Sequence, residues 1–458
     1  MKARDLDPRL SALGDLDISR IDNLSGDCQP GSLFVAVPGT MSDGTAYIPD
    51  AIAHGAVAVV ATAPSDLVPT VVVSASEIRE LLSQISARMV GNPENQLRIV
   101  SVTGTNGKTS VTHFVRDLAL ALGESATAMG TLSHVRTTPA PPELFRSLRE
   151  ILDREGAGTI VAMEVSSHAL DQGRTDGVIA EVAVFTNLSH DHLDYHLSMD
   201  SYFAAKALLF TPEHSRRGVV VDSTWGQRLL AQSRVPTMSV STADFTSLHV
   251  GWSEISGWWR GYEFTAPVGG EVNVLNLAAA MAAVSELTNA PDRDIAEAAS
   301  RLAAVPGRYQ VIHRRPDIVV DYAHTPDGLQ QILRDAHTMT TGRILVVFGC
   351  GGDRDREKRP VMGDIAFHSA DIRIITTDNS RSEDPADIAR DIIGSHDSEH
   401  FHVELDRRQA IAYALSMATS DDVVIIAGKG HESTQTIGTT VSTFSDVDTV
   451  RELLESPC

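Results

Sequence analysis

A glycine-rich loop between an apolar strand and an amphipathic helix constrains this chain more than any other feature. The apolar run IVSV precedes Gly104-Thr105-Asn106-Gly107-Lys108-Thr109-Ser110, and the helix pattern VTHFVRDLALALG follows it. In such a loop, backbone N–H groups and the helix N-terminus bind phosphate, the lysine adds positive charge, and the threonine hydroxyl binds magnesium. The segment therefore predicts nucleotide binding.

The loop is a shortened form of the common phosphate-loop pattern, because Gly104 lies three residues before Gly107. A glycine turn that only caps the helix is the alternative interpretation. Two glycines together with Lys108 and Thr109, directly after an apolar strand, disfavour that alternative.

Strand-length apolar runs alternate with helix patterns along the rest of the chain. TIVAMEV and VAVFTNL follow the loop, and PDIVVDYAHTP, RILVVFG, IRIITT and DVVIIAG form a second series. This alternation predicts an α/β fold with mostly parallel, doubly wound sheets. Polar, proline-containing segments divide the chain into a small α/β unit over 1–96, a central phosphate-loop unit over 97–308 and a dinucleotide-binding-like α/β unit over 309–458.

Charge and composition exclude several classes of function. The formal net charge of −22 disfavours non-specific binding to nucleic acid or to an anionic membrane, so an anionic substrate needs a local basic pocket. Three cysteines, Cys28, Cys350 and Cys458, are far apart and indicate neither a disulfide framework nor a thiolate zinc site. The charged N-terminus has no signal-peptide pattern, and no apolar run is long enough to span a membrane. We expect a cytoplasmic protein.

Polar clusters end two strands of the central unit. Glu164 follows TIVAM, and FTNLSHDHLDYH crowds imidazoles and carboxylates into one loop after VAVF. Because open α/β sheets bind ligands at the carboxyl ends of their strands, Glu164 and His192 are candidate magnesium ligands. The H-D-H-x-D spacing would also suit a zinc hydrolase, but the phosphate loop upstream favours magnesium nucleotide chemistry.

Two later loops, DYAHTP and GCGGDRD, also end apolar strands. The glycines of the second loop could serve only to let the backbone turn. Arg354 among them indicates carboxylate binding, because a guanidinium donates two parallel hydrogen bonds to a carboxylate.

Six motifs occur in order along the chain: TGTNGKTS, AMEVSSHAL, FTNLSHDHLDYH, DYAHTP, FGCGGDRD and AGKGHE. With PGSLFVAVPGTMSDGTAYIPDAIAHGAVAVV near the N-terminus, they resemble the Mur ligase family over almost the whole chain, and most closely its tripeptide-forming branch. The resemblance implies an ATP-dependent ligase of bacterial cell-wall synthesis. Its three domains would bind a uridine nucleotide, ATP and an amino acid; ATP would phosphorylate the substrate carboxylate, and the amine would attack the acyl phosphate.

The resemblance assigns the chemistry to the phosphate loop and its surroundings. Lys108 and magnesium would offset developing negative charge. Lys206, in YFAAKALLF, would be carbamylated to N6-carboxylysine and bind magnesium beside Thr109, Glu164 and His192. By itself, the sequence indicates instead that Lys206 is a surface residue of a helix. The implied catalytic residues are Lys108, Lys206 and His192.

Further contacts are implied residue by residue on the matching motifs. The nucleotide would be contacted by Asn276 near the adenine, Arg308 near the phosphates and Asp321 near the ribose. The uridine-linked muramoyl dipeptide would be contacted by Ser25, Thr137, Thr138, Ser166, Gln172 and Arg174. The amino acid would be contacted by Arg354, Asp378, Asn379, Arg381, Gly428 and Glu432.

The implied amino acid is meso-diaminopimelate, whose side chain ends in a carboxylate and an amine. Arg381 and Glu432 could meet those two groups, and a lysine or ornithine side chain, the alternative substrates, would leave Arg381 unpaired. We expect a monomer that acts on small-molecule substrates, ATP, the UDP-N-acetylmuramoyl dipeptide and the diamino acid, with neither nucleic acid nor membrane as a partner. A phosphate-loop NTPase without ligase activity is the alternative from another class.

Four segments depart from the family pattern. Leu24-Ser25-Gly26 stands where Asp-Ser-Arg is usual, Ser380 replaces a proline, His190 replaces an arginine, and Glu271-Val272 replaces a small residue and phenylalanine. The loss of proline before Arg381 removes a rigid backbone position from the specificity loop. None of the changes alters the class of reaction that the motifs imply.

Overall fold

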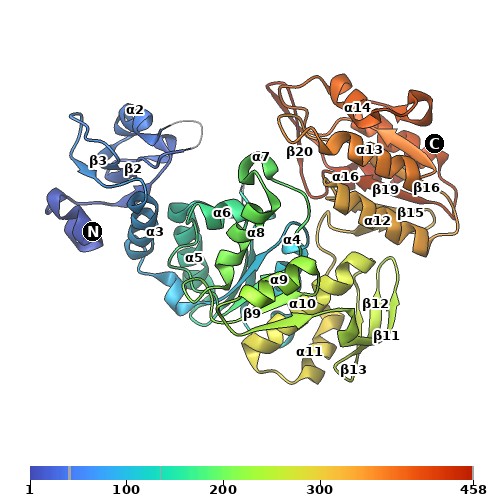
Figure 1. The fold of residues 1–458 in the computed structure, drawn as a ribbon, viewed down its shortest axis with the longest axis horizontal. Coiled ribbons are helices and arrows are strands. Elements are labelled where there is room, and N and C mark those ends of the chain that lie inside the picture. Colours follow the sequence, from blue (N-terminus) through green and yellow to red (C-terminus); the bar gives the residue numbers. More distant parts are fainter. Residues whose placement is uncertain (40–42, 135, 456–458) are drawn as a thin grey trace.

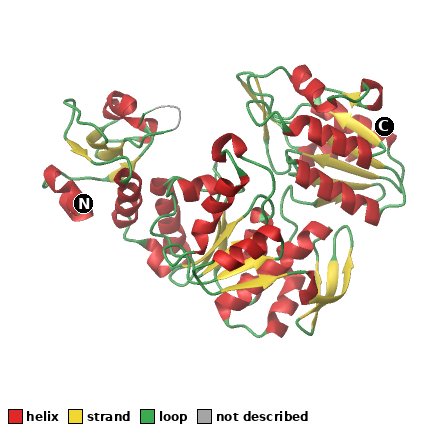
Figure 2. Cartoon of the chain, in the orientation of Figure 1, coloured by secondary structure: helices red, strands yellow, loops and turns green. Residues whose placement is uncertain are grey.

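The computed structural model describes residues 1–39, 43–134 and 136–455. The chain forms three α/β units in sequence order, with the N-terminal unit at one end, the phosphate-loop unit in the middle and the C-terminal unit at the other end (Figure 1). Helices pack against the central and C-terminal sheets (Figure 2). No helix among these residues is both long and apolar enough to cross a membrane.

The N-terminal unit is built on a four-stranded parallel sheet in the order β1-β2-β3-β4. Helix α3 (Glu77–Met89) covers it, because its apolar side chains at Ile78, Leu81 and Ile85 share one buried cluster with Leu33 of the sheet. The strands are β1 (Arg20–Asp22), β2 (Ser32–Val35), β3 (Ala56–Ala61) and β4 (Thr70–Val72).

The central unit contains a six-stranded parallel sheet in the order β10-β9-β8-β5-β7-β6. Successive residues of β5 bury on opposite faces: Val100 joins the core formed with α4 and α10, whereas Ile99 joins the core formed with α5 and α8. The strands are β5 (Arg98–Thr103), β6 (Ala126–Met129), β7 (Ile160–Glu164), β8 (Val182–Phe185), β9 (Gly218–Val221) and β10 (Thr237–Val240). The helices named for these two cores are α4 (Lys108–Ala121), α5 (Pro141–Glu155), α8 (Met199–Ala207) and α10 (Glu271–Thr288).

A second, antiparallel sheet extends the central unit. It consists of β11 (Phe245–Val250), β12 (Ile255–Trp259) and β13 (Tyr262–Ala266). Trp259 is 1% exposed and joins the core of α4 and α10. This sheet was not predicted from the sequence.

The C-terminal unit has a six-stranded sheet in the order β14-β15-β19-β16-β17-β18. Only the edge strand β14 is antiparallel to its neighbour. The strands are β14 (Gln310–His313), β15 (Asp317–Asp321), β16 (Ile344–Phe348), β17 (Ile372–Ile375), β18 (His402–Val403) and β19 (Val423–Ala427). The predicted α/β fold with mostly parallel, doubly wound sheets is confirmed.

A buried ion pair ties three elements of the C-terminal unit together. Arg407, the first residue of α15 (Arg407–Met417), donates to both carboxylate oxygens of Asp446 at 2.7 and 2.8 Å and to the carbonyl oxygen of Ala427 at 2.9 Å. Asp446 begins α16 (Asp446–Glu455), and both side chains of the pair are 0% exposed. The pair therefore fixes two helix starts against the end of β19.

We predict that Arg407→Ala lowers the free energy of unfolding of the C-terminal unit by about 3–5 kcal/mol, because it leaves the Asp446 carboxylate buried without its counter-ion. Arg408→Ala is the matched control, since Arg408 pairs with Glu452 at the surface, and its cost should stay within about 1 kcal/mol. Urea denaturation followed by circular dichroism measures both. Equal losses in the two variants would contradict the prediction.

Candidate functional site

The phosphate loop lies between the end of β5 at Thr103 and the start of α4 at Lys108. Gly104 and Gly107 have φ values of +154° and +82°. A Cβ on Gly104 would collide with the Thr186 hydroxyl, and one on Gly107 with the Asn276 side chain. The two glycines thus allow the loop to pack against the end of β8 and against α10.

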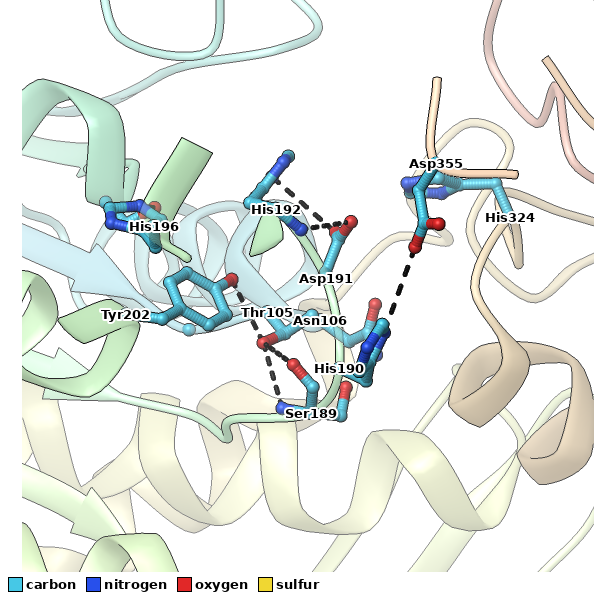
Figure 3. Close-up of polar contacts among 12 residues, drawn as sticks. Thr105, Asn106, Ser189, His190, Asp191, His192, His196, Tyr202, His324 and Asp355 are labelled. Carbon is cyan, nitrogen blue, oxygen red and sulfur yellow. Dashed lines mark hydrogen bonds and ion pairs between the residues drawn. The ribbon is translucent and has the colours of Figure 1, made fainter. Parts of the chain in front are cut away.

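Residues that follow β8 hold the loop in place. Asn106 N–H donates to Asn187 Oδ1 at 2.9 Å, while Asn187 Nδ2 and Thr186 Oγ1 donate to the Asn106 carbonyl oxygen at 3.2 and 2.6 Å. Thr105 Oγ1 lies 3.1 Å from Tyr202 Oη and accepts from Ser189 N–H at 3.0 Å (Figure 3). No role was predicted from the sequence for Thr186, Asn187 or Tyr202, although all three lie in the quoted segments FTNLSHDHLDYH and YFAAKALLF.

Two lysines meet at one carbonyl oxygen. Lys108 Nζ and Lys206 Nζ donate to the Gly104 oxygen at 2.9 and 2.8 Å, and Lys206 Nζ also lies 3.4 Å from Thr103 Oγ1. Lys206 is 1% exposed, so the expectation of a surface residue was wrong: α8 turns this side chain toward the phosphate loop. Burial, and then the charge of Lys108, lower the pKa of Lys206 well below its usual value.

Glu164 ends β7 and points at the loop that follows β6. Its Oε1 accepts from Thr131 N–H at 2.9 Å and its Oε2 from Thr131 Oγ1 at 3.2 Å. The residue is 2% exposed and forms no ion pair with any residue that the structure describes. The charge of Lys108 acts on Glu164, but no direct ion pair uses its carboxylate, which makes the carboxylate a suitable ligand for a cation.

His192 lies in the loop between β8 and α8, where its Nε2 is 3.5 Å from Asp191 Oδ2 (Figure 3). Partial burial lowers the pKa of His192 to about 4, so the ring is neutral at physiological pH and has a free nitrogen lone pair. Across residues 1–39, 43–134 and 136–455, no group of three or more His, Cys, Asp or Glu side chains is arranged to hold a metal ion. The predicted magnesium ligands include only two residues of those types, Glu164 and His192.

Arg308, at the end of the central unit, and Asp327 of the C-terminal unit both contact the phosphate loop. Arg308 Nη2 donates to Thr109 Oγ1 at 3.0 Å, its guanidinium lies 4.0 Å from the centre of the Tyr322 ring, and Asn106 Nδ2 donates to Asp327 Oδ2 at 3.1 Å. Of the predicted nucleotide contacts, Arg308 thus touches the loop, and Asn276 lies against it at Gly107.

The other two predicted nucleotide contacts make bonds within the protein. Asp321 is near the linker, where its Oδ2 accepts from Tyr309 N–H at 2.6 Å. Asn276 Nδ2 donates to Asn273 Oδ1 at 3.1 Å. Asn273, and not Asn276, lines a cavity next to the loop together with Trp252 and Tyr309.

Most of the predicted amino-acid contacts form one cluster. Glu432 Oε2 accepts from Asn379 Nδ2 at 2.8 Å and from Lys429 Nζ at 2.9 Å, and Lys429 also donates to Asn379 Oδ1 at 3.3 Å. Lys429 is 0% exposed and was missed by the sequence analysis, although it stands inside the AGKGHE motif. A Cβ on Gly428, at the start of that loop, would lie 2.9 Å from Asp378 Oδ2.

The two arginines of the amino-acid set lie beside one glycine. Arg381 Nη1 donates to the Gly352 carbonyl oxygen at 2.6 Å. A Cβ on Gly351 would lie 3.1 Å from Arg381 Nη1 and 3.8 Å from Arg354 Cγ. The structure therefore brings Arg354 and Arg381 together, next to the Asn379 and Glu432 cluster.

The predicted muramoyl-peptide contacts lie around the end of β7, with one exception. Thr138 Oγ1 donates to the Glu164 carbonyl oxygen at 2.9 Å and accepts from Ser166 N–H at 3.0 Å, and Arg174 Nη1 donates to the Thr138 carbonyl oxygen at 3.1 Å. Thr137 and Gln172 belong to the same group through bonds to Thr131, Tyr195 and Arg174. Ser25 is separate, in the short η2 helix (Ser25–Asp27) of the N-terminal unit.

Comparison with known proteins agrees with this arrangement of motifs. Three family models match the chain: "Mur ligase family, catalytic domain" over 18–96, "Mur ligase middle domain" over 102–284 and "Mur ligase, glutamate ligase domain" over 307–430. A Synechococcus elongatus protein named UDP-N-acetylmuramoyl-L-alanyl-D-glutamate–2,6-diaminopimelate ligase is 42% identical over 97% of this chain and 95% of its own length. The chain belongs to the Mur ligase family. The predicted resemblance is confirmed.

Other relatives of this Mur ligase agree. A Coxiella burnetii protein of the same name is 39% identical over 98% of both chains. A solved structure titled with that enzyme name is 30% identical, covers 99% of both chains and superimposes with a TM-score of 0.67. An Acinetobacter baumannii ligase that adds D-alanyl-D-alanine, at 17% identity, 96% and 93% coverage and a TM-score of 0.65, shares the fold.

We predict that Gly107→Ala weakens ADP binding by about tenfold or more, because the added methyl group displaces Asn276 and opens the loop. Gly123→Ala, at the other end of α4, is the matched control: Gly123 has a φ of +85°, and a Cβ there meets nothing within 4 Å. That variant should cost about 1 kcal/mol of stability through backbone strain and leave ADP binding unchanged. Calorimetric titration with ADP distinguishes the two, and equal weakening in both would refute the steric explanation.

Proposed function

We propose that this Mur ligase joins meso-diaminopimelate to the D-glutamate of UDP-N-acetylmuramoyl-L-alanyl-D-glutamate, with ATP hydrolysed, in peptidoglycan synthesis. The observation that carries the proposal is the meeting of a phosphate loop, Lys108 and the buried Lys206 around the Gly104 carbonyl oxygen, together with the buried carboxylate of Glu164, whose charge acts on Lys108. The names of the relatives at 42% and 39% identity support the choice of substrates.

In the proposed reaction, a carboxylate oxygen of the dipeptide attacks the γ-phosphorus of ATP, and the bond from that phosphorus to the β-phosphate oxygen breaks. The amine of diaminopimelate then attacks the carbonyl carbon of the acyl phosphate, loses a proton, and expels phosphate. The loop N–H groups, Lys108 and Arg308 supply fixed positive charge where negative charge builds up on the phosphoryl oxygens. Closing the C-terminal unit on the loop would bring the amine to the carbonyl carbon.

The residues around Gly104 fit a magnesium ion. Glu164 offers an unpaired buried carboxylate, and His192 offers a neutral imidazole. Thr109 offers a hydroxyl, and Lys206, whose low pKa favours the neutral amine, could add carbon dioxide with loss of a proton and become an anionic carbamate. Magnesium, when bound to these four residues, would offset negative charge on the transferring phosphoryl group.

Selectivity for diaminopimelate rests on opposite charges in one pocket. Arg381 and Arg354 present guanidinium groups for the distal carboxylate, while Glu432 presents one carboxylate oxygen, Oε1, that its bonds to Asn379 and Lys429 leave open. Lysine or ornithine, the alternative substrates, have no distal carboxylate and would leave both guanidiniums without a carboxylate partner. We further propose that the enzyme acts in the cytoplasm as a monomer, and thereby contributes to cell shape and division.

Phosphate release measured with ATP alone, then with the UDP-muramoyl dipeptide, then with diaminopimelate added, tests the proposed function. Phosphate release should require all three substrates and yield one amide product per phosphate. Hydrolysis of ATP independent of both additions would show that the protein is a phosphate-loop NTPase and not a ligase. Parallel assays with lysine and ornithine identify the amino acid.

Arg381→Ala should reduce kcat/KM for diaminopimelate by about a hundredfold, because a bidentate bond between charged groups contributes about 3 kcal/mol. The KM for ATP should change less than twofold. Arg390→Ala is the control, since Arg390 pairs with Asp387 on the surface of α14 (Pro385–Ile393) in the same unit. Unchanged kinetics with diaminopimelate in the Arg381 variant would remove the selectivity argument.

Lys206→Ala should abolish measurable turnover, and a short carboxylate such as acetate should restore part of it by replacing the missing anion. Lys206→Arg, which keeps a positive charge and cannot form a carbamate, should be as inactive and should not respond to acetate. Steady-state amide formation measures both variants. Full turnover by Lys206→Ala would contradict the carbamate role.

A further inference from the structure

One lysine of the C-terminal unit is buried among the polar side chains of the amino-acid pocket. Lys429 follows β19 and is 0% exposed, a degree of burial that a lysine reaches only when its charge is paired. Its Nζ donates to Glu432 Oε2 at 2.9 Å, to Asn379 Oδ1 at 3.3 Å and to the Thr434 carbonyl oxygen at 2.7 Å. An ammonium group has three hydrogens, so none remains for a substrate. Lys429 therefore acts through the groups that it holds.

The three acceptors of Lys429 come from separate segments. Glu432 lies in the loop after β19, Asn379 lies in the loop after β17, and Thr434 begins β20 (Thr434–Ile437). β20 pairs with β21 (Thr440–Thr443) in an antiparallel hairpin on the side of the C-terminal unit that faces the central unit (Figure 1). Lys429 thus joins both pocket loops to this hairpin.

The hairpin also holds the main chain of Arg381. Arg381 N–H donates to the Thr436 carbonyl oxygen at 3.2 Å, and Gly438 N–H donates to the Arg381 carbonyl oxygen at 2.7 Å. Thr436 N–H donates to Asn379 Oδ1 at 2.9 Å, which ties a second pocket residue to the same strand. Arg381 has a φ of +49°, and these bonds fix that backbone conformation although Ser380 stands where the family pattern has a proline.

We propose that Lys429 is a positioning residue of the amino-acid pocket: together with β20 it fixes Glu432 relative to Arg381, and so selects the configuration of the distal carbon of diaminopimelate. The inference rests on the proposed function, in which Glu432 meets the distal amine and Arg381 the distal carboxylate. Glu432 Oε2 has one other bond, from Asn379 Nδ2 at 2.8 Å. Without Lys429, the Glu432 carboxylate could turn about that single bond.

Selection of a configuration requires partners of opposite charge in fixed places. The distal carbon of diaminopimelate carries an amine, a carboxylate, a hydrogen and the chain that leads to the reacting end. The LL isomer has the opposite configuration at this carbon, so with the chain in the same place its amine faces Arg381 and its carboxylate faces Glu432. Both contacts then bring like charges together. Flexible partners could move to relieve this repulsion, whereas partners held on one strand cannot.

The test compares kcat/KM for meso- and LL-diaminopimelate in the full-length wild type and in Lys429→Met, which keeps an unbranched side chain and removes its three donors. Wild type should prefer the meso isomer by about a hundredfold or more. Lys429→Met should lower that preference by about tenfold and keep the wild-type KM for ATP. Arg343→Ala is the matched control and should keep the preference, because Arg343 pairs with Asp422 where β16 and β19 begin, at the other end of these strands.

Gln435→Leu tests the hairpin without changing Lys429. Gln435 Nε2 donates to the carbonyl oxygens of Thr377 and Asp378, each at 3.1 Å, and so ties β20 to the segment before Asn379. Loss of both bonds should lower the meso preference by about threefold or more. This variant decides the question if Lys429→Met does not fold.

An unchanged meso preference in either folded variant would overturn the positioning role, whether kcat/KM for the two isomers falls equally or not at all. A wild type that uses both isomers equally well would also overturn it, and would leave the proposed ligase reaction in place. If the wild type forms no amide from either isomer, the proposed function fails, and the inference fails with it.

Discussion

The carbonyl oxygen of Gly104 accepts hydrogen bonds from Lys108 and Lys206, and the site depends on that shared acceptor. Two ammonium groups can share one oxygen in a buried place only if their charge is reduced, and burial lowers the pKa of both lysines. The contact joins the phosphate loop to α8, whose lysine has one other polar contact there, Thr103 Oγ1 at 3.4 Å. Because Gly104 packs against Thr186, the end of β8 is held in the same contact.

The overall charge of the protein and the charge of its pockets have opposite signs. Most arginines pair with carboxylates at the surface, as Arg149 does with Asp153, and contribute little to stability there. Arg308, Arg381, Arg79 and Arg174 point instead at neutral oxygens or at an aromatic ring. The acidic exterior repels anionic ligands, whereas guanidiniums without carboxylate partners attract them to the clefts.

Motifs at strand ends could be grouped from the sequence because parallel strands present their carboxyl ends at one edge of the sheet. β5 lies between β7 and β8, so the loop after Thr103 meets Glu164 and Thr186. Single contacts were less predictable. Asn273, and not Asn276, faces the cavity next to the loop, and Lys429 joins Glu432 to Asn379. Neither contact could be predicted from the sequence, because the first depends on the rotation of a helix and the second on the path of a loop.

Periodic apolar runs and glycine spacing determined the α/β fold, the phosphate loop and the strand ends that carry polar residues, because those features are set by local backbone geometry and burial. The tertiary structure alone decided the environment of Lys206. In the sequence, Lys206 is a lysine on a short predicted helix, and a lysine side chain in such a place is usually solvated. Packing of α8 against the loop removes water from its amine, and the resulting loss of hydration lowers its pKa and decides its chemistry.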